Sequence, residues 1–259
     1  MADALYRLDG RTATPAELTR GPWDARAQHG GAPAALLAGA LERTGDRALP
    51  VIRLTLEFLR SVPIEPLSLS TRVVRGGRRV QLVEADLLAG EVAVVRATAL
   101  KIRSGEGNVP SITDASEPPP GPSAGAARPV ELAVAPPWFG EDAVEVRFVA
   151  GDYAEPGPAT AWFRLRVPVI SDTEPSPLQR AAAAADFGNG ISSALDWSRF
   201  TFVNADLTIY LERATAGEWV GVDAITTVEP GGTGLTRSVL YDERGRIGQA
   251  AQALYVARR

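Results

Sequence analysis

The chain has 259 residues, of which 45% are hydrophobic and 22% charged, and its formal net charge is −4. Such a composition is typical of a globular protein, and the length fits one large domain or two domains of about 100–150 residues each. Because cysteine is absent, disulfides, thiolate metal sites and a cysteine nucleophile are excluded. The small negative charge gives no general attraction for nucleic acid, so we expect no nucleic-acid partner.

Neither a membrane segment nor a secretion signal is predicted. No apolar stretch approaches the roughly 18–20 residues of a membrane span. The first ten residues carry Asp3, Arg7 and Asp9 where a signal peptide needs an apolar core. We therefore expect a cytoplasmic protein without a membrane span.

His29 is the only histidine, which limits the chemistry open to this chain. A Ser-His-Asp hydrolase places its serine on a G-x-S-x-G elbow, and that motif does not occur in the sequence. A metal site built from histidines is equally disfavoured. We expect neither a metal nor another cofactor.

The first half is predicted to be a helix followed by an antiparallel meander. A short strand is expected over residues 5–8, and a helix over residues 30–43, which are rich in Ala and Leu and lack β-branched runs. Turn residues such as Gly76-Gly77 and Ala89-Gly90 then separate alternating stretches. These stretches predict strands at residues 53–60, 67–74, 79–88 and 91–103.

The segment that follows differs from everything around it. Its prolines lie among Gly, Ser and Ala with little apolar periodicity, as is typical of an interdomain linker. We therefore divide the chain into an N-terminal domain of residues 1–103, a poorly packed linker of residues 104–140 and a C-terminal domain of residues 141–259.

The second half repeats the order of signals seen in the first. Two strands are predicted before the helix and four after it, with a turn at Asp242 to Gly245 between the last two. The helix is expected over residues 177–187. The strands are expected at residues 144–149, 159–166, 202–213, 218–228, 235–241 and 247–257.

Landmarks at nearly constant spacing indicate that the halves arose by duplication. Leu54-Thr55 in the first half matches Leu207-Thr208 in the second at an offset of 153, and the turn glycines Gly90 and Gly245 match at an offset of 155. A helix followed by a long antiparallel meander is the hotdog arrangement, in which the sheet wraps the helix. Two copies pair edge to edge because a single copy leaves an open sheet edge. The predicted fold class is therefore α+β, a double hotdog formed within one chain.

With these features the sequence resembles the TesB-like branch of the acyl-CoA thioesterases over nearly its whole length apart from the linker. The order and spacing of several short motifs carry the resemblance. These are Gln28 to Gly31 before the first helix, Phe58-Leu59-Arg60, Ala185-Asp186-Phe187, Asn204 to Thr208, Asp242 to Gly245, and Gln252.

The resemblance implies an enzyme that hydrolyses an acyl-CoA thioester, with its site in the C-terminal copy. An aspartate at the helix, a hydroxyl or amide residue on the long strand and a glutamine on the last strand hold a water, and these map onto Asp186, Asn204 and Gln252. A known member of the family has threonine at the position of Asn204, and an asparagine lacks the hydroxyl donor. The partner implied is acyl-CoA. Oligomeric state is left open, with a homo-oligomer of double-hotdog chains as one form.

The duplication supports the same three residues independently. Carried back by the offsets, Asn204 falls on Val51, Gln252 on Ala97, and Asp186 near Pro33. A core position that accepts an apolar residue in one copy has no structural need for a polar one in the other, so the polar choice indicates function. Thr208 has a threonine, Thr55, at the matching place and is predicted to be structural.

Further residues are candidates for substrate binding. His29, Gly30 and Gly31 place backbone N–H groups at a helix N-terminus, which suits a thioester carbonyl, although glycines there also serve simply to let the chain turn into the helix. Arg78 and Arg79, in a cluster around one hairpin, suit CoA phosphates, although such a cluster is often only a solvated turn.

Two other functions remain open from the sequence. A double-hotdog hydratase or dehydratase uses an Asp and His five residues apart, a spacing that Asp24 and His29 have, but the Asn-Pro that accompanies such a pair is missing. A non-catalytic acyl or acyl-CoA binder that kept the fold and lost the chemistry is the second alternative, and Asn204 is its best support.

Overall fold

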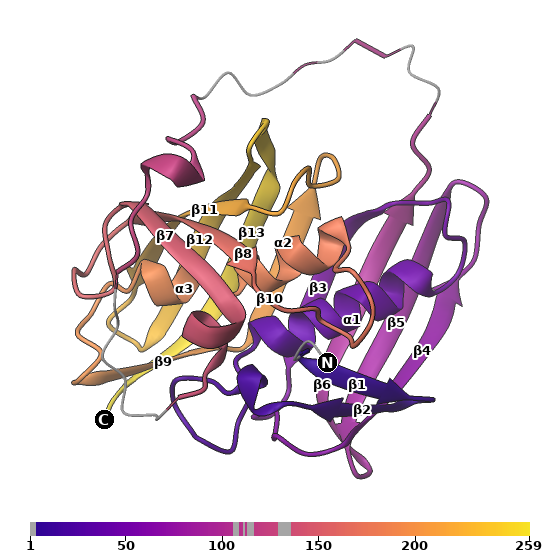
Figure 1. Cartoon of the computed structure of the whole chain (residues 1–259), viewed down its shortest axis with the longest axis horizontal. Helices are drawn as coiled ribbons and strands as arrows, with labels where there is room; N and C mark the ends of the chain where they lie inside the picture. Colours follow the sequence, from indigo (N-terminus) through magenta and orange to yellow (C-terminus); the bar gives the residue numbers. More distant parts are fainter. Residues whose placement is uncertain (1–3, 106–108, 111, 113–116, 129–135) are drawn as a thin grey trace.

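The computed structural model describes residues 4–105, 109–110, 112, 117–128 and 136–259. Its strands form one continuous antiparallel sheet of 13 strands that wraps around two central helices (Figure 1). Among the described residues, no helix has the length and apolar character needed to cross a membrane.

Both halves have the same topology. The sheet order is β1-β2-β4-β5-β6-β3-β10-β13-β12-β11-β8-β7. From outer edge to centre, the N-terminal half has the order β1-β2-β4-β5-β6-β3 and the C-terminal half β7-β8-β11-β12-β13-β10, so matching strands occupy matching places. The N-terminal half contains β1 (Tyr6–Asp9), β2 (Thr12–Pro15), α1 (Gly31–Arg43), β3 (Val51–Phe58), β4 (Leu67–Arg75), β5 (Val80–Ala89) and β6 (Val92–Ile102). The C-terminal half contains β7 (Val144–Ala150), β8 (Ala159–Leu165), α2 (Pro177–Ala185), α3 (Gly188–Ile191), β9 (Phe200–Asn204), β10 (Asp206–Leu211), β11 (Val220–Val228), β12 (Thr233–Asp242) and β13 (Gly245–Arg258).

The predicted double hotdog is therefore confirmed, with small differences in its elements. β2 was not predicted, because its sequence, Thr-Ala-Thr-Pro, has no large apolar residue. The long strand expected over residues 202–213 is two strands, β9 and β10, interrupted at Ala205, and both pair with β13.

The halves join where β3 pairs with β10. Thr55 lies opposite Thr208, with Leu54 opposite Ile209 and Leu56 opposite Leu207, so the duplicated threonines face each other at the centre of the molecule. Their hydroxyl oxygens are 3.3 Å apart and hydrogen-bonded. This contact agrees with the structural role predicted for Thr208.

Strand pairing corrects the offset assigned to the glycine turns. Val83 pairs with Ala99 in the first half and Thr236 with Gln252 in the second, so the offset of 153 holds through these strands as well. Gln252 therefore matches Ala99, not Ala97. The turn glycines do not occupy matching positions, so they gave a wrong offset. The two-residue loop of the first hairpin contains Gly90, whereas the loop between Asp242 and Gly245 of the second contains no glycine.

The two central helices run antiparallel to each other in the core. Glycines let them approach closely, since a Cβ on Gly31 would lie 2.8 Å from the Ala183 carbonyl oxygen. Ser176 caps the start of α2 through a capping box, and the Gln179 side chain also donates to the Ala35 carbonyl oxygen at 3.2 Å. The start of α1 is thereby placed beside the end of α2.

The described part of the linker is packed, which corrects the expectation of a poorly packed segment. Residues 117–128 lie against the C-terminal half, where Ala126 pairs with Phe148 of β7 and the Trp162 indole donates to the Pro120 carbonyl oxygen at 2.8 Å. Residues 106–108, 111, 113–116 and 129–135 of the predicted linker lie outside the described residues.

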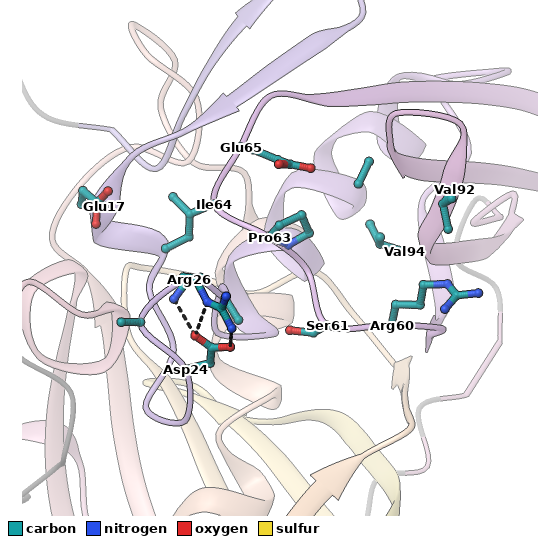
Figure 2. A pocket seen from close by; sticks show the side chains of 13 residues that line it. Glu17, Asp24, Arg26, Arg60, Ser61, Pro63, Ile64, Glu65, Val92 and Val94 are labelled. Carbon is teal, nitrogen blue, oxygen red and sulfur yellow. Dashed lines mark hydrogen bonds and ion pairs between the residues drawn. The ribbon is translucent and has the colours of Figure 1, made fainter.

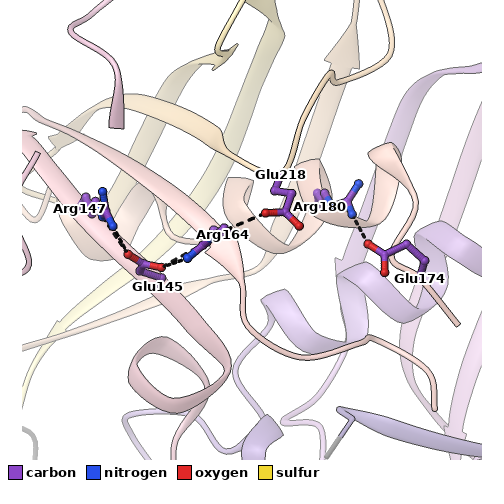
Figure 3. Close-up of polar contacts among 6 residues, drawn as sticks. All are labelled: Glu145, Arg147, Arg164, Glu174, Arg180 and Glu218. Atoms are coloured by element: carbon purple, nitrogen blue, oxygen red, sulfur yellow. Dashed lines mark hydrogen bonds and ion pairs between the residues drawn. The ribbon is translucent and has the colours of Figure 1, made fainter. Parts of the chain in front are cut away.

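β7 is the outer strand of the C-terminal half and carries charged side chains (Figure 3). Glu145 accepts from Arg147 and from Arg164 of β8, each at 2.6 Å, and Arg164 also reaches Glu218 at 3.5 Å. Charged residues on an outer strand disfavour pairing with another chain, so these ion pairs protect the sheet edge.

Another ion pair has a fully buried carboxylate. Asp242, at the end of β12, is buried and accepts from Arg213 at 2.6 Å and from the backbone N–H groups of Ala216 and Arg244. Burial alone would raise the pKa of Asp242, but these hydrogen bonds together hold its pKa below the usual value.

We expect Asp242→Asn to lower the free energy of unfolding by about 3 kcal/mol at pH 7, the lower end for breaking a buried pair, because Arg213 stays partly in water. Since the pKa is depressed in the folded state, the difference from wild type should shrink as the pH falls below about 4. Urea unfolding at several pH values measures this. Asp86→Asn, which breaks the exposed pair with Arg96, is the control and should cost about 0–1 kcal/mol; equal losses for both variants would contradict the prediction.

Candidate active site

Asp186 lies at the C-cap of α2 and is the centre of the candidate site. Five alanines, Ala181 to Ala185, precede it, and all are buried because small side chains let α2 lie deep between α1 and the sheet. The Asp186 side chain is only 4% exposed. A carboxylate in such a place is costly unless other groups compensate its charge.

Two side chains contact the Asp186 carboxylate, one from each half of the chain. The Asn204 amide, at the end of β9, donates to Oδ1 at 2.7 Å. His29 Nδ1, just before α1, lies 3.0 Å from Oδ2. Both carboxylate oxygens are therefore compensated, and the site is assembled across the junction between the halves.

The contact between His29 and Asp186 requires a proton. Two unprotonated acceptor atoms repel each other at 3.0 Å, so one proton lies between Nδ1 and Oδ2. The Gly31 N–H also points at Nδ1 from 3.0 Å and competes for it. We assign the proton to Nδ1, because a charged carboxylate is a stronger hydrogen-bond partner than a neutral backbone amide. The other ring nitrogen, Nε2, is then an acceptor.

Gln252 contacts the turn that carries Asp186, not the carboxylate. Its amide donates to the Asp186 backbone carbonyl at 3.3 Å, and its side-chain oxygen accepts from the Asn189 N–H at 3.0 Å. Gln252 is buried in β13. The structure thus brings the three residues predicted from the sequence together, and Gln252 links the start of α3 to the sheet.

A chain of buried hydroxyls supports the same turn. Ser192 donates to the Gly188 carbonyl oxygen at 2.8 Å and is 2.7 Å from Thr226, which is 2.7 Å from Thr236. At the offset of 153, Thr236 matches the buried Val83. Polar residues beneath α3 thus replace apolar ones in the other half.

Matching the helices by their N-caps corrects the position predicted for Asp186 in the first copy. The caps are Gly30 and Ser176, which are 146 residues apart, and this offset carries Asp186 back to Ala40, not to Pro33. Ala40 is buried, as are Val51 and Ala99, the matches of Asn204 and Gln252. The argument that polar residues replace apolar ones in the second copy therefore survives with corrected partners.

Aromatic rings and glycines enclose the histidine and the carboxylate. The His29 ring lies 4.6 Å from the Phe187 ring and 5.0 Å from the Phe139 ring, centroid to centroid. A Cβ on Gly30 would be 2.8 Å from Asp186 Oδ2 and 3.0 Å from the end of the Phe58 ring. Only glycine fits between these groups at position 30.

Arg78 and Arg79 are not brought to this site. They directly precede β5. The start of β5 lies near the C-terminal end of α1, because Gln81 accepts from the N–H of Asp46, which follows that helix. His29 precedes the N-terminal end of the same helix, and its 13 residues span about 20 Å. Contact of Arg78 and Arg79 with substrate stays a prediction.

Asp24 does not pair with His29 either. It is exposed and pairs with Arg26 at 3.3 Å in a cleft of about 860 Å³ (Figure 2). The residues lining that cleft include none of Asp186, Asn204, Gln252 and His29. The carboxylate that meets His29 is Asp186, 157 positions away in the sequence.

The side chain of His29 is the part of the candidate site that the sequence predicted least well. Only its neighbouring backbone was expected to matter strongly, because no local spacing connects it to Asp186. The one signal that points to its side chain is that it is the only histidine in the chain and directly precedes the helix.

The single histidine makes the proton assignment testable, because ¹⁵N NMR spectra of the imidazole show one residue. We expect the Nδ1–H tautomer in the wild type at neutral pH. In Asp186→Ala the Gly31 N–H should bind Nδ1, so the proton should move to Nε2. Asp196→Ala removes an exposed carboxylate that contacts Ser198 and should leave the spectrum unchanged. An Nε2–H tautomer in the wild type would refute the assignment.

Family models for acyl-CoA thioesterases match both halves of the sequence. The model of the N-terminal domain matches residues 19–102, and that of the C-terminal domain matches residues 113–256. A search of curated proteins finds no match for this chain.

Solved structures with the same fold cover nearly the whole chain. A provisionally assigned thioesterase II from Thermobifida fusca superposes with a TM-score of 0.78 at 20% identity, over 97% of this chain and 94% of that one. The acyl-CoA thioesterase II TesB2 of Mycobacterium marinum gives 0.67 at 18% identity, over 98% and 94%. A protein of Alicyclobacillus acidocaldarius described as having a hot dog fold gives 0.76 at 16% identity, over 97% and 95%.

At these identities the structural matches establish the fold alone, and the family comes from the sequence models. Those models cover most of the chain and match its two halves in the order in which the sheet is built. The resemblance predicted from the sequence is thereby confirmed, and this chain belongs to the acyl-CoA thioesterase family.

Proposed function

We propose that this protein hydrolyses an acyl-CoA thioester to a free acid and CoA, with Asp186 as the group that activates water. The observation that carries the proposal is the buried carboxylate of Asp186 at the end of a helix. Each half of the chain compensates its charge, because His29 contacts one oxygen and Asn204 the other. Such a carboxylate in a member of this family suits general base catalysis.

In the proposed reaction a water oxygen attacks the thioester carbonyl carbon. Asp186 takes a proton from that water, and His29 keeps the carboxylate oriented through Nδ1. The carbon–sulfur bond then breaks, the proton passes to the leaving sulfur, and free CoA and the carboxylic acid are released. A positioned general base of this kind contributes about 10²–10⁴-fold to a rate.

Asn204 can serve this reaction although it lacks a hydroxyl. Its amide nitrogen donates to Asp186, and its side-chain carbonyl oxygen remains an acceptor that a water can use. The amide thus supplies both a donor and an acceptor at this position. The departure from threonine is therefore compatible with turnover.

The start of α1 provides a donor for the developing oxyanion. The Ala32 N–H donates to the His29 carbonyl oxygen, whereas the Gly31 N–H lies 3.0 Å from Nδ1, which cannot accept it while Nδ1 carries the proton. The Gly30 N–H has no acceptor among the described residues. With the positive end of the helix dipole beside it, this N–H suits the charge that appears on the carbonyl oxygen.

Substrate details are part of the proposal and rest on the family. The acyl group is unspecified, a cytoplasmic location stays a prediction, and contact of Arg78 and Arg79 with CoA phosphates would require the substrate to extend about 20 Å along α1. No metal or other cofactor is needed for the proposed steps.

Asp186→Asn tests the proposal directly. The variant is nearly isosteric and should keep the fold, yet it should lower acyl-CoA turnover by roughly 10²-fold or more, because the amide cannot accept the proton. His29→Ala should also lower turnover, by at least about 10-fold, since it removes the partner of Oδ2. Thiol release from a panel of acyl-CoAs measures both, with Asp196→Asn as the control. Wild-type turnover in Asp186→Asn would exclude Asp186 as the base.

The same panel separates the alternatives. Release of thiol identifies a thioesterase, whereas loss of an enoyl group without thiol release identifies a hydratase. Binding of acyl-CoA without either reaction identifies a binder.

Gln252→Ala should have a smaller effect than Asp186→Asn. Gln252 positions the turn and does not touch the carboxylate, so turnover should fall by roughly 10-fold, which corresponds to about 1.4 kcal/mol in the barrier. Gln81→Ala, whose residue lies at the far end of α1, is the control. A loss in Gln252→Ala as large as that in Asp186→Asn would instead place Gln252 in contact with the reacting atoms.

A further inference from the structure

The cleft shown in Figure 2 contains an arginine whose counterpart in the C-terminal half is paired with a buried carboxylate. At the offset of 153, Arg60 matches Arg213. Ala89 matches Asp242 in the same way. Two nitrogens of Arg213 donate to the two oxygens of Asp242, and the bond to Oδ1 is 2.6 Å long. The N-terminal half thus has the same arginine but an alanine in place of its acidic partner.

Backbone hydrogen bonds show that these positions correspond in space as well as in sequence. The Leu59 N–H donates to the Val94 carbonyl oxygen. At the offset of 153, the Glu212 N–H donates to that of Ile247. The hairpin pairing of Ala89 follows the same offset. Both arginines therefore leave the sheet at matching points, beside matching hairpins.

Arg60 faces an open cleft where Arg213 meets a carboxylate. The Arg60 side chain is exposed and has no partner in the part of the chain that the structure describes, and no dashed line reaches it in Figure 2. Arg60 and Ala89 both line the cleft of about 860 Å³. A guanidinium with five N–H donors is thus left without a protein acceptor beside an empty volume.

The other groups of the cleft do not neutralise Arg60. Three carboxylates line the cleft, those of Glu17, Asp24 and Glu65. Two of them are paired with neighbouring arginines, Arg20 and Arg26, and none forms an ion pair with Arg60. A hydroxyl lies next to the free guanidinium, because the cleft is also lined by Ser61, whose match in the C-terminal half is Ala214.

We propose that Arg60 and Ser61 form a binding site for a phosphate group. A phosphate offers a guanidinium the same pair of oxygen acceptors as a carboxylate, so it can occupy the place that the Asp242 carboxylate fills in the other half. The small side chain of Ala89 leaves room for the ligand, and the Ser61 hydroxyl supplies a further donor.

The position of the site suits a phosphate of the CoA part of the substrate, and this step rests on the proposed function. Residues 24–27 of the cleft directly precede His29, and Arg60 is two positions after Phe58, whose ring borders the start of α1. In acyl-CoA a pantetheine chain separates the thioester from the phosphates. A thioester at Asp186 and a phosphate at Arg60 are therefore compatible with one bound molecule.

Isothermal titration calorimetry tests the site without any reaction. Inorganic pyrophosphate and CoA should bind the wild type, and Arg60→Ala should weaken both by roughly 10-fold or more, because it removes a charge-assisted pair of hydrogen bonds. Pantetheine, which lacks phosphate, should bind both proteins equally. Arg7→Ala removes an exposed arginine of β1 outside the cleft and is the control. Pyrophosphate that binds Arg60→Ala as tightly as the wild type, or does not bind the wild type, would overturn the proposal.

Ala89→Asp reproduces the arrangement of the C-terminal half and gives an independent test. The added carboxylate should pair with Arg60 as Asp242 pairs with Arg213, so pyrophosphate binding should be lost while the unfolding temperature is no lower than that of the wild type. Ala89→Asn, which has nearly the same shape without the charge, should bind pyrophosphate more tightly than Ala89→Asp. Wild-type affinity in Ala89→Asp would mean that the anion does not bind at Arg60.

Turnover distinguishes a phosphate of the substrate from a phosphate of another compound. If the group belongs to CoA, Arg60→Ala should raise KM for acyl-CoA by roughly 10-fold or more and leave kcat and KM for an acyl-pantetheine unchanged. A variant that loses pyrophosphate binding but keeps wild-type CoA binding and KM would overturn the assignment to CoA. A wild type that hydrolyses neither thioester would refute the proposed hydrolysis, whereas the calorimetry would still decide the phosphate site.

Discussion

The close antiparallel contact between α1 and α2 is the constraint on which the site depends. It sets the first residues of one helix against the last residues of the other, so His29 meets Asp186. Gly31 permits this approach, because a Cβ there would collide with the Ala183 carbonyl oxygen and the Phe139 ring. A larger residue at Gly31 would push the helices apart and open the 3.0 Å contact between Nδ1 and Oδ2.

The burial of Asp186 explains why hydrogen-bond donors surround its carboxylate. A carboxylate removed from water is strongly disfavoured unless hydrogen-bond donors replace the lost solvent. Asp186 receives one donor on each oxygen and a further one on its backbone carbonyl from Gln252. An arrangement that compensates the charge also orients the carboxylate, as the proposed role of Asp186 as a general base requires.

The duplication lets one half of the molecule serve as a control for the other on both sides of the sheet. On the inner side, Asn204, Gln252 and Thr236 replace buried apolar residues beside Asp186. On the outer side, Tyr210 and Ile225 replace charged residues. The inner positions are polar although they are buried, and the outer positions are apolar although they are exposed.

The sequence by itself determined the local elements, the duplication and the family. Helix and strand periodicity are local properties, and the repeated Leu-Thr motifs mark the two copies without any structure. The convergence of Asp186, Asn204 and Gln252 was also predictable, because hotdog topology places a helix end and two strands together. Only the tertiary structure decided that His29 contacts Asp186, that Gln252 matches Ala99, and that Gln252 contacts the turn and not the carboxylate. These depend on helix packing and strand register between residues far apart in the chain, for which no local pattern in the sequence carries information.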